Sequence, residues 1–465
     1  MKSKYKKLFS NSLLFTIGNL GSKFITFIML PLYTYKLNVN EFGITDLVQT
    51  TAGLLVPIVY LCIYDAVLRF SMEEEENAKQ ILSIAFFVAS ITSSIVFIGA
   101  LILSFFKINY AMYVGLIIIL QGFQIIFSQF CKAIGKIQKF AINGILLTLL
   151  TAIFNIVFLV IFNWGVSGFF ISIILANFLS IIYLVKSIQF FGNIDFNLLN
   201  KQKLSELLSF SIPLIPNSIA WWVTNTASRY FILFFLGTSA NGIFAIANKI
   251  PSLLTLINSV FYQSWQLSSV EEYKSSTKDK FYTDVFNAYS AVLFVSTMSI
   301  LFFIKPILNI LVTKSFYSAW RYVPFLMLTV VYSSLSSFLG QNYIVAKNTN
   351  KIFSTTILGA IINVVFNLIL IPIIGLDGAG ISSSLSFLFV MMYRLFDSKK
   401  IINIEINKSQ FIGNNIIILI QIGALYSIKG YSVYIVQIVL IIFIIVINRS
   451  TIRIAIKMFA KKNNA

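Results

Sequence analysis

Residues 81–106 read ILSIAFFVASITSSIVFIGALILSFF, an apolar run without a single charged side chain. At about 1.5 Å of rise per residue, such a run is long enough to cross the roughly 30 Å hydrocarbon core of a bilayer. A chain inside lipid must satisfy its backbone hydrogen bonds internally, so the run predicts a helix. Spanning β barrels are built from short segments of alternating polarity, and this run shows no alternation.

Similar apolar runs recur from one end of the chain to the other. The chain has 465 residues, of which 58% are hydrophobic and 11% charged, whereas soluble domains contain about 25% charged residues. We therefore expect an all-α polytopic membrane protein with about fourteen transmembrane helices. The spans are predicted near residues 11–33, 44–64, 81–106, 111–131, 140–162, 166–185, 207–235, 243–267, 284–304, 322–346, 352–373, 378–396, 411–427 and 431–448.

The Lys and Arg residues are concentrated in alternate segments between the predicted spans. The formal net charge is +19, and most of the 35 Lys and Arg residues fall in alternate connecting segments. Because Lys and Arg concentrate on the cytoplasmic side, these segments are predicted to be cytoplasmic, and so are both termini. Arg394, at the end of its apolar run, is assigned to this cytoplasmic group. The distribution argues against a nucleic-acid partner.

Several kinds of site are excluded by composition. The chain contains no histidine, which removes the usual proton shuttle and the commonest metal ligand. The two cysteines, Cys62 and Cys131, lie in or beside apolar runs and predict neither a disulfide framework nor a metal site. We predict no metal, no cofactor and no catalytic residue.

The sequence also contains an internal duplication. NIVFLVIFNWGVSG, from Asn155, resembles NVVFNLILIPIIGLDG, from Asn363, and LNVNEFGI at residues 37–44 resembles LGTSANGI at residues 236–243. The offsets correspond to six spans, an even number, which predicts two parallel repeats around a central cavity. The expected organisation is an N-lobe over 1–200, a C-lobe over 201–400, and two further helices with a cytoplasmic tail over 401–465.

Three basic residues lie within predicted spans: Lys23, Arg229 and Lys249. A charge at the centre of a spanning helix costs roughly 2.5–3.5 kcal/mol on insertion scales, so such residues are functional candidates. Arg229 and Lys249 lie near enough to a span end for snorkelling to the headgroups to explain them equally well. Snorkelling is harder for Lys23, which lies near mid-depth.

Polar residues accompany each of these cations on one helix face, as 3.6-residue periodicity requires. The proline residues Pro213, Pro216 and Pro251 interrupt the spans that carry Arg229 and Lys249, as is common at transport sites. Hydrogen bonding between helices is the alternative explanation for the polar stripes. The neighbouring residues of interest are Asn19 and Thr26 beside Lys23, Ser218, Trp222 and Asn225 before Arg229, and Asn248 and Ser252 around Lys249.

Acidic partners are scarce in these spans. Asp65 and Arg69, spaced i, i+4, are expected to form an ordinary pair at a helix end. A cavity lined by cations without acids favours an anionic substrate that supplies the counter-charge, such as a phosphate or diphosphate.

The chain resembles the polysaccharide repeat-unit flippases of the MOP superfamily, relatives of the lipid II flippases and MATE exporters. The resemblance is carried by residues 11–47 (NSLLFTIGNLGSKFITFIMLPLYTYKLNVNEFGITDL), residues 210–237 (FSIPLIPNSIAWWVTNTASRYFILFFLG), and the GIFAIANKIPSLL and GLDGAG segments that follow. Many members read Asp-Arg-Tyr where this chain has Ser228-Arg229-Tyr230, which removes one candidate partner for Arg229.

The resemblance implies a flippase of the bacterial cytoplasmic membrane that turns an undecaprenyl-diphosphate-linked oligosaccharide to the outer leaflet, for capsule, O-antigen or exopolysaccharide synthesis. It places Lys23, Arg229 and Lys249 where such flippases have cavity-lining cations. A polysaccharide polymerase and chain-length machinery are the implied protein partners. The alternatives are a MATE-type multidrug or solute exporter, which typically carries a carboxylate in its first span, and a membrane polysaccharide polymerase.

Overall fold

The fold is built from helices and their connections. The computed structural model describes residues 21–73, 75–346, 348–449 and 451, and no β strand occurs within them. The predicted all-α class is thus confirmed. The chain divides into two compact units, Met1–Trp222 and Val223–Ala465. The finer division into two lobes and a C-terminal pair stays a prediction.

Unit 1 contains a helical stretch at residues 21–28 and then a series of helices. These are α2 (Leu30–Lys36), α3 (Val39–Val59), α4 (Ile63–Phe70), α5 (Ala78–Phe105), α6 (Ala111–Ala133), α7 (Ile137–Asn155), the π-helical η1 (Ile156–Ile161), α8 (Gly165–Ser187), α9 (Phe190–Asn193), η2 (Phe196–Leu198) and α10 (Lys201–Ser211). Helix α11 (Leu214–Thr226) continues past the boundary between the units.

Unit 2 continues from the end of α11. Its elements are α12 (Ser228–Leu236), α13 (Thr238–Ala247), α14 (Pro251–Glu272), α15 (Lys278–Phe302), α16 (Ile304–Leu311), η3 (Lys314–Arg321), α17 (Val323–Val345), α18 (Thr349–Ile374), α19 (Leu376–Asp397), η4 (Ser398–Lys400), α20 (Lys408–Ser427) and α21 (Ser432–Ile447).

The helices have the length and composition of membrane spans. Among the described residues, 11 helices are long and apolar enough to cross a bilayer, or 12 if the bent pair α13 and α14 forms one span. The first predicted span, 11–33, begins outside the described residues, and α21 is a shorter apolar helix of 16 residues. A multi-pass membrane protein is confirmed, whereas the count of fourteen stays a prediction.

The outer faces of these helices are apolar, as lipid contact requires. Ile95 on α5 is 64% exposed, and Ile435 and Phe443 on α21 are 67% and 57% exposed. Exposed apolar patches of this extent are rare on soluble monomers and mark a membrane or protein interface. The apolar runs that predicted the spans therefore supply the surface that contacts the bilayer.

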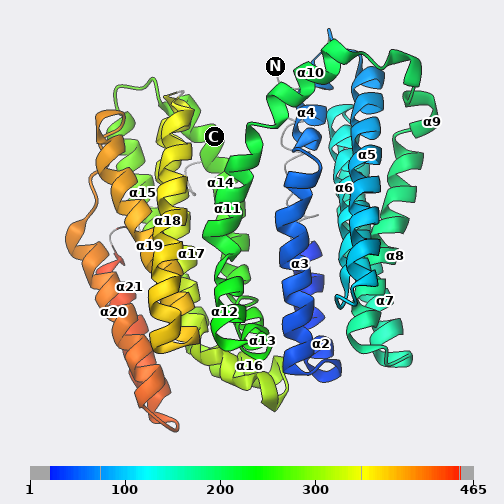
Figure 1. The fold of residues 1–465 in the computed structure, drawn as a ribbon. Coiled ribbons are helices and arrows are strands. Elements are labelled where there is room, and N and C mark those ends of the chain that lie inside the picture. The colour runs from blue at the N-terminus through cyan, green and yellow to red at the C-terminus, as the bar shows by residue number, and fades with distance from the viewer. Residues whose placement is uncertain (1–20, 74, 347, 450, 452–465) are drawn as a thin grey trace. The chain divides into compact units, whose positions relative to one another are not determined.

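The helix packing repeats between the two sequence-related segments. In unit 1, α6 and α7 both pack against α8 (Figure 1). In unit 2, α17 and α18 both pack against α19 in the same chain order. This correspondence supports the duplication.

The paired glycines at the turns into α8 and α19 both have a positive φ. Gly165 at the start of α8 has φ +52°, and Gly375 just before α19 has φ +64°. This left-handed region costs glycine little and other residues considerably more. Three residues later, Gly168 and Gly378 lie against the preceding helix, where a Cβ would come within 3.1 Å of Phe158 and 2.5 Å of the Leu370 backbone.

Gly378→Ala is expected to destabilise the protein, because the new methyl group would meet backbone atoms that cannot move independently. Overpacking of this kind costs about 1–3 kcal/mol. Gly423→Ala on α20 is the matched control, since no atom lies within 4 Å of a Cβ there. The thermal midpoint in detergent is the measurement. Equal midpoints for the two variants would show that the α18–α19 contact tolerates a methyl group.

Candidate functional site

Lys23 lies on the helical stretch at residues 21–28 and is exposed. Ser22 Oγ donates to Gly144 O on α7 at 3.2 Å, which fixes one face of this stretch against unit 1. Thr26, three residues after Lys23, is exposed too, and its hydroxyl donates to Ser22 O in its own helix at 2.9 Å. The stripe formed by Lys23 and Thr26 therefore does not pack inside unit 1. Asn19 lies outside the described residues.

Trp222 makes a hydrogen bond between helices. Its half-buried indole Nε1 donates to Thr50 O on α3 at 3.1 Å. One turn earlier on α11, Ser218 Oγ lies 3.7 Å from Cys62 Sγ. Trp222 and Ser218 thus contact other segments of unit 1, as the alternative explanation of the polar stripe, packing and hydrogen bonding between helices, predicts.

Arg229 follows a break in the same span. Helix α11 ends at Thr226 and α12 begins at Ser228, so the half-buried Arg229 is the second residue of α12. Asn225, in the last turn of α11, is exposed. A second break separates α10 from α11 at residues 212–213, where Pro213 was predicted to interrupt the span.

Lys249 lies inside the break between α13 and α14, where the helix axis bends by 46°. Pro251, the first residue of α14, has no N–H to continue the helix, and the predicted interruption here is confirmed. Side chains satisfy carbonyls at the break: Asn248 Nδ2 donates to Phe244 O at 2.9 Å, and Ser252 Oγ donates to Lys249 O. Asn248, Lys249 and Ser252 are all half-buried.

The structure thus distributes the predicted cations between the units. Lys23 belongs to unit 1, whereas Arg229 and Lys249 belong to unit 2, each at or beside a break in a predicted span. Within the unit that carries them, Lys23, Asn225 and Thr26 are exposed rather than packed.

Unit 2 contains a buried cation that the sequence pattern did not indicate. Arg394, on α19, is only 5% exposed. Its Nε and Nη2 donate to Thr355 Oγ1 at 3.0 and 2.8 Å, Nη2 also donates to Thr356 Oγ1 at 3.2 Å, and Nη1 donates to Ser336 O at 3.0 Å. Gly340 leaves room for the guanidinium, because a Cβ there would lie 2.9 Å from Nη1. Arg394 lies in the last turn of α19, and its assignment to the cytoplasmic side stays a prediction.

The expected Asp65–Arg69 pair is also wrong. Arg69 pairs instead with Glu73, one turn further along, at 2.5 Å. Glu76 pairs with Lys203 of α10, which also contacts Glu206 at 2.9 Å. The acidic run at residues 73–76 thus supplies ion pairs within unit 1.

Known proteins share both the sequence pattern and the fold. The family described as polysaccharide biosynthesis protein matches residues 8–265. A protein of the Lsg locus of Haemophilus influenzae is 23% identical over 286 residues, which cover 59% of this chain and 68% of that protein.

Solved structures extend the likeness over nearly the whole chain. The lipid II flippase MurJ in an inward closed conformation superposes with a TM-score of 0.73 at 13% identity, covering 95% of this chain and all 100% of that one. A multidrug resistance MATE transporter in an inward-facing conformation gives a TM-score of 0.67 at 11% identity, covering 81% and 94%. A MOP superfamily transporter from Pyrococcus furiosus gives 0.61 at 12% identity, covering 85% and 95%. At these identities the likeness shows the fold.

The apolar spans, the broken helices and this likeness define a multi-pass membrane protein with the fold of the MOP superfamily. Its family match covers more than half of the sequence. The chain belongs to the polysaccharide biosynthesis protein family.

Proposed function

We propose that the protein is a flippase that moves an undecaprenyl-diphosphate-linked oligosaccharide from the cytoplasmic to the outer leaflet of a bacterial cytoplasmic membrane. The observation that carries the proposal is the set of basic side chains in its predicted spans, Lys23, Arg229 and Lys249, in a chain of the polysaccharide biosynthesis family. A flipped repeat unit would feed capsule, O-antigen or exopolysaccharide synthesis by a polymerase and chain-length machinery.

The cations have the charge that this substrate needs. A lipid-linked diphosphate enters the membrane interior only where its negative charge is compensated, and Lys and Arg are the side chains that bind phosphate oxygens. In our proposal Lys23, Arg229 and Lys249 contact the diphosphate during alternating access. The polar side chains of Asn19, Thr26, Asn225, Asn248 and Ser252 and the Trp222 ring offer contacts for the sugars.

The helix breaks suit such a site for a second reason. Interrupted spans expose backbone groups within the membrane, and discontinuous helices recur at the substrate sites of transporters. Lys249 lies in one break and Arg229 follows another. The backbone that carries these two side chains can therefore change conformation and lose fewer hydrogen bonds than the backbone of a regular helix would.

The membrane potential favours this direction of transport. Moving two negative charges outward across a membrane that is negative inside is favourable by about 4–5 kcal/mol per 100 mV. The emptied cationic site is drawn back toward the cytoplasm by the same field. Ion antiport is the alternative driving force. Transport driven by a membrane potential in the absence of an ion gradient would favour the first mechanism, and a requirement for the gradient would favour antiport.

Depletion of the protein in its native host is the test of the proposed function. We expect surface polymer to disappear while complete lipid-linked repeat units accumulate in the cytoplasmic leaflet, as measured by leaflet-selective labelling of the sugar. Single repeat units stranded on the outer leaflet would instead identify a polymerase. Normal polymer with increased sensitivity to cationic drugs would identify a multidrug exporter.

A further inference from the structure

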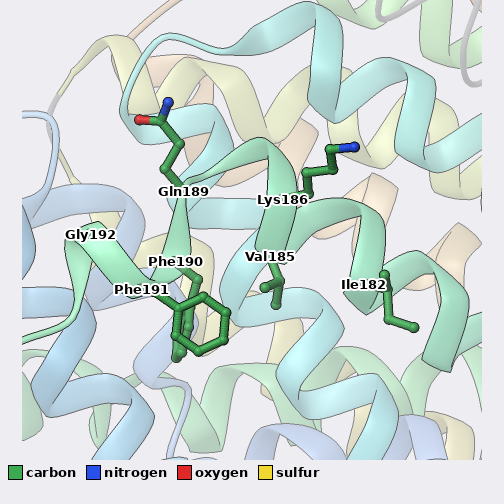
Figure 2. Close-up of a pocket in the computed structure, with 7 residues that line it drawn as sticks. All are labelled: Ile182, Val185, Lys186, Gln189, Phe190, Phe191 and Gly192. Atoms are coloured by element: carbon green, nitrogen blue, oxygen red, sulfur yellow. The ribbon is translucent and has the colours of Figure 1, made fainter.

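A cavity of about 420 Å³ lies at the C-terminal end of α8 in unit 1 (Figure 2). Ile182, Val185 and Lys186 of α8 line one side at helical spacing, and the turn residue Gln189 and the α9 segment Phe190–Gly192 line the rest. Residues spaced by three and four positions lie on one helix face, so this side runs from the apolar Ile182 and Val185 to the polar Lys186. Figure 2 shows the polar ends of Lys186 and Gln189 on one side of the chain turn and the two Phe rings on the other.

The wall formed by α9 is held by packing. Gln189 has φ +53°, which turns the chain after α8, and Asn193 Nδ2 donates back to Ile188 O at 2.8 Å. Phe190 is buried, with its ring centroid 5.1 Å from that of Phe86 and 5.3 Å from that of Phe127. Its neighbour Phe191 is thereby left outside and is 85% exposed. Its exposed ring offers apolar surface at the end of the span.

The polar end of the cavity is cationic. Lys186 is exposed, and it forms no ion pair or hydrogen bond among the described residues. A second cation lies at the same helix end, because Lys136 Nζ donates to Ser187 O at 2.8 Å. None of the residues that line the cavity is acidic. The site therefore combines an apolar floor with a positively charged rim.

We propose that this cavity binds an anionic glycerophospholipid, with the phosphate on Lys186 and an acyl chain along Ile182, Val185 and Phe191. In the orientation predicted from the basic residues, this end of α8 faces the cytoplasm, where the leaflet carries negative surface charge. Basic pockets beside spanning helices on that side bind anionic lipid headgroups, and each Lys near the surface contributes about 1 kcal/mol. The site concerns a resident lipid and is independent of the proposed substrate.

Native mass spectrometry of the delipidated protein, titrated with phosphatidylglycerol or phosphatidylcholine, tests the proposal. The unmodified protein is expected to bind phosphatidylglycerol more tightly. Lys186→Gln should weaken that preference about fivefold, the equivalent of about 1 kcal/mol. Lys186→Arg should preserve it, and Val185→Trp, which obstructs the apolar side of the cavity, should reduce the binding of both lipids.

Lys107→Gln is the matched control, because Lys107 is also an exposed lysine of unit 1 and lies in the connection between α5 and α6, outside the residues that line the cavity. Its lipid preference should equal that of the unmodified protein. Equal binding of the two lipids by the unmodified protein would overturn the proposal, as would an unchanged preference in Lys186→Gln. An equal loss in Lys107→Gln would also overturn it, since the preference would then follow net charge and not this cavity.

Discussion

Replacing Lys23 by alanine is expected to reduce surface polymer sharply while lipid-linked repeat units accumulate on the cytoplasmic leaflet. A hydrogen bond to a charged group contributes about 1.5–3 kcal/mol, so the loss of one phosphate contact should slow translocation by roughly 10- to 100-fold. Lys23 is chosen because it is the predicted cation for which snorkelling is hardest. The exposure of its side chain within unit 1 leaves it available to a substrate.

Two further substitutions separate charge from shape. Lys23→Gln keeps most of the length without the charge and should behave like the alanine variant, whereas Lys23→Arg should retain substantial transport. Lys314→Ala, which removes an exposed lysine from η3, is the control for a general loss of positive charge. Normal polymer in well-expressed Lys23→Ala and Lys23→Gln cells would remove Lys23 from the mechanism and weaken the proposed diphosphate contact.

Arg394→Met is expected to lower the thermal midpoint of the purified protein substantially. The guanidinium joins Ser336 on α17 and Thr355 and Thr356 on α18 to α19. Methionine fills similar space but donates no hydrogen bond, and each buried acceptor left unsatisfied costs about 1–3 kcal/mol. The thermal midpoint of Arg394→Lys should lie between those of the unmodified protein and Arg394→Met, because an ammonium group cannot reproduce the planar fork of donors of a guanidinium.

Lys399→Met on η4 is the matched control, since it removes a nearby but exposed cation. An unchanged or higher thermal midpoint for Arg394→Met also has a physical basis, because replacing a buried charge by an apolar side chain can stabilise a protein. A midpoint equal to or above that of the unmodified protein would therefore show that Arg394 does not hold the three helices together. Its burial would then call for a role in transport.

The sequence predicted the features that depend on local composition. Apolar runs predicted the all-α membrane fold, and Pro213 and Pro251 located two of the helix breaks, since a missing N–H acts on its own turn. The glycine pairs Gly165/Gly375 and Gly168/Gly378 are part of the sequence pattern that predicts the duplication, and Gly165 and Gly375 share a positive φ.

What the sequence could not supply are contacts between residues distant in the chain. Trp222 donates to a carbonyl 172 positions away, and Arg394 finds its hydroxyl acceptors 38 and 39 positions away. Nothing in the local pattern around either residue indicates these partners. The polar pair Thr355 and Thr356 within an apolar run was the one available signal for Arg394, because buried hydroxyls in a span need a partner.

The glycine turns of α8 and α19 show that the backbone can stay alike in two segments whose functional side chains differ. Their likeness lies in the backbone, which two copies of an ancestral segment can keep while their side chains diverge. The predicted cations are not shared equally: Lys23 belongs to unit 1, and Arg229 and Lys249 belong to unit 2. Under the proposed function, the two units would then contribute different contacts to the substrate. Evolution could then alter recognition in one half without rebuilding the architecture of the other.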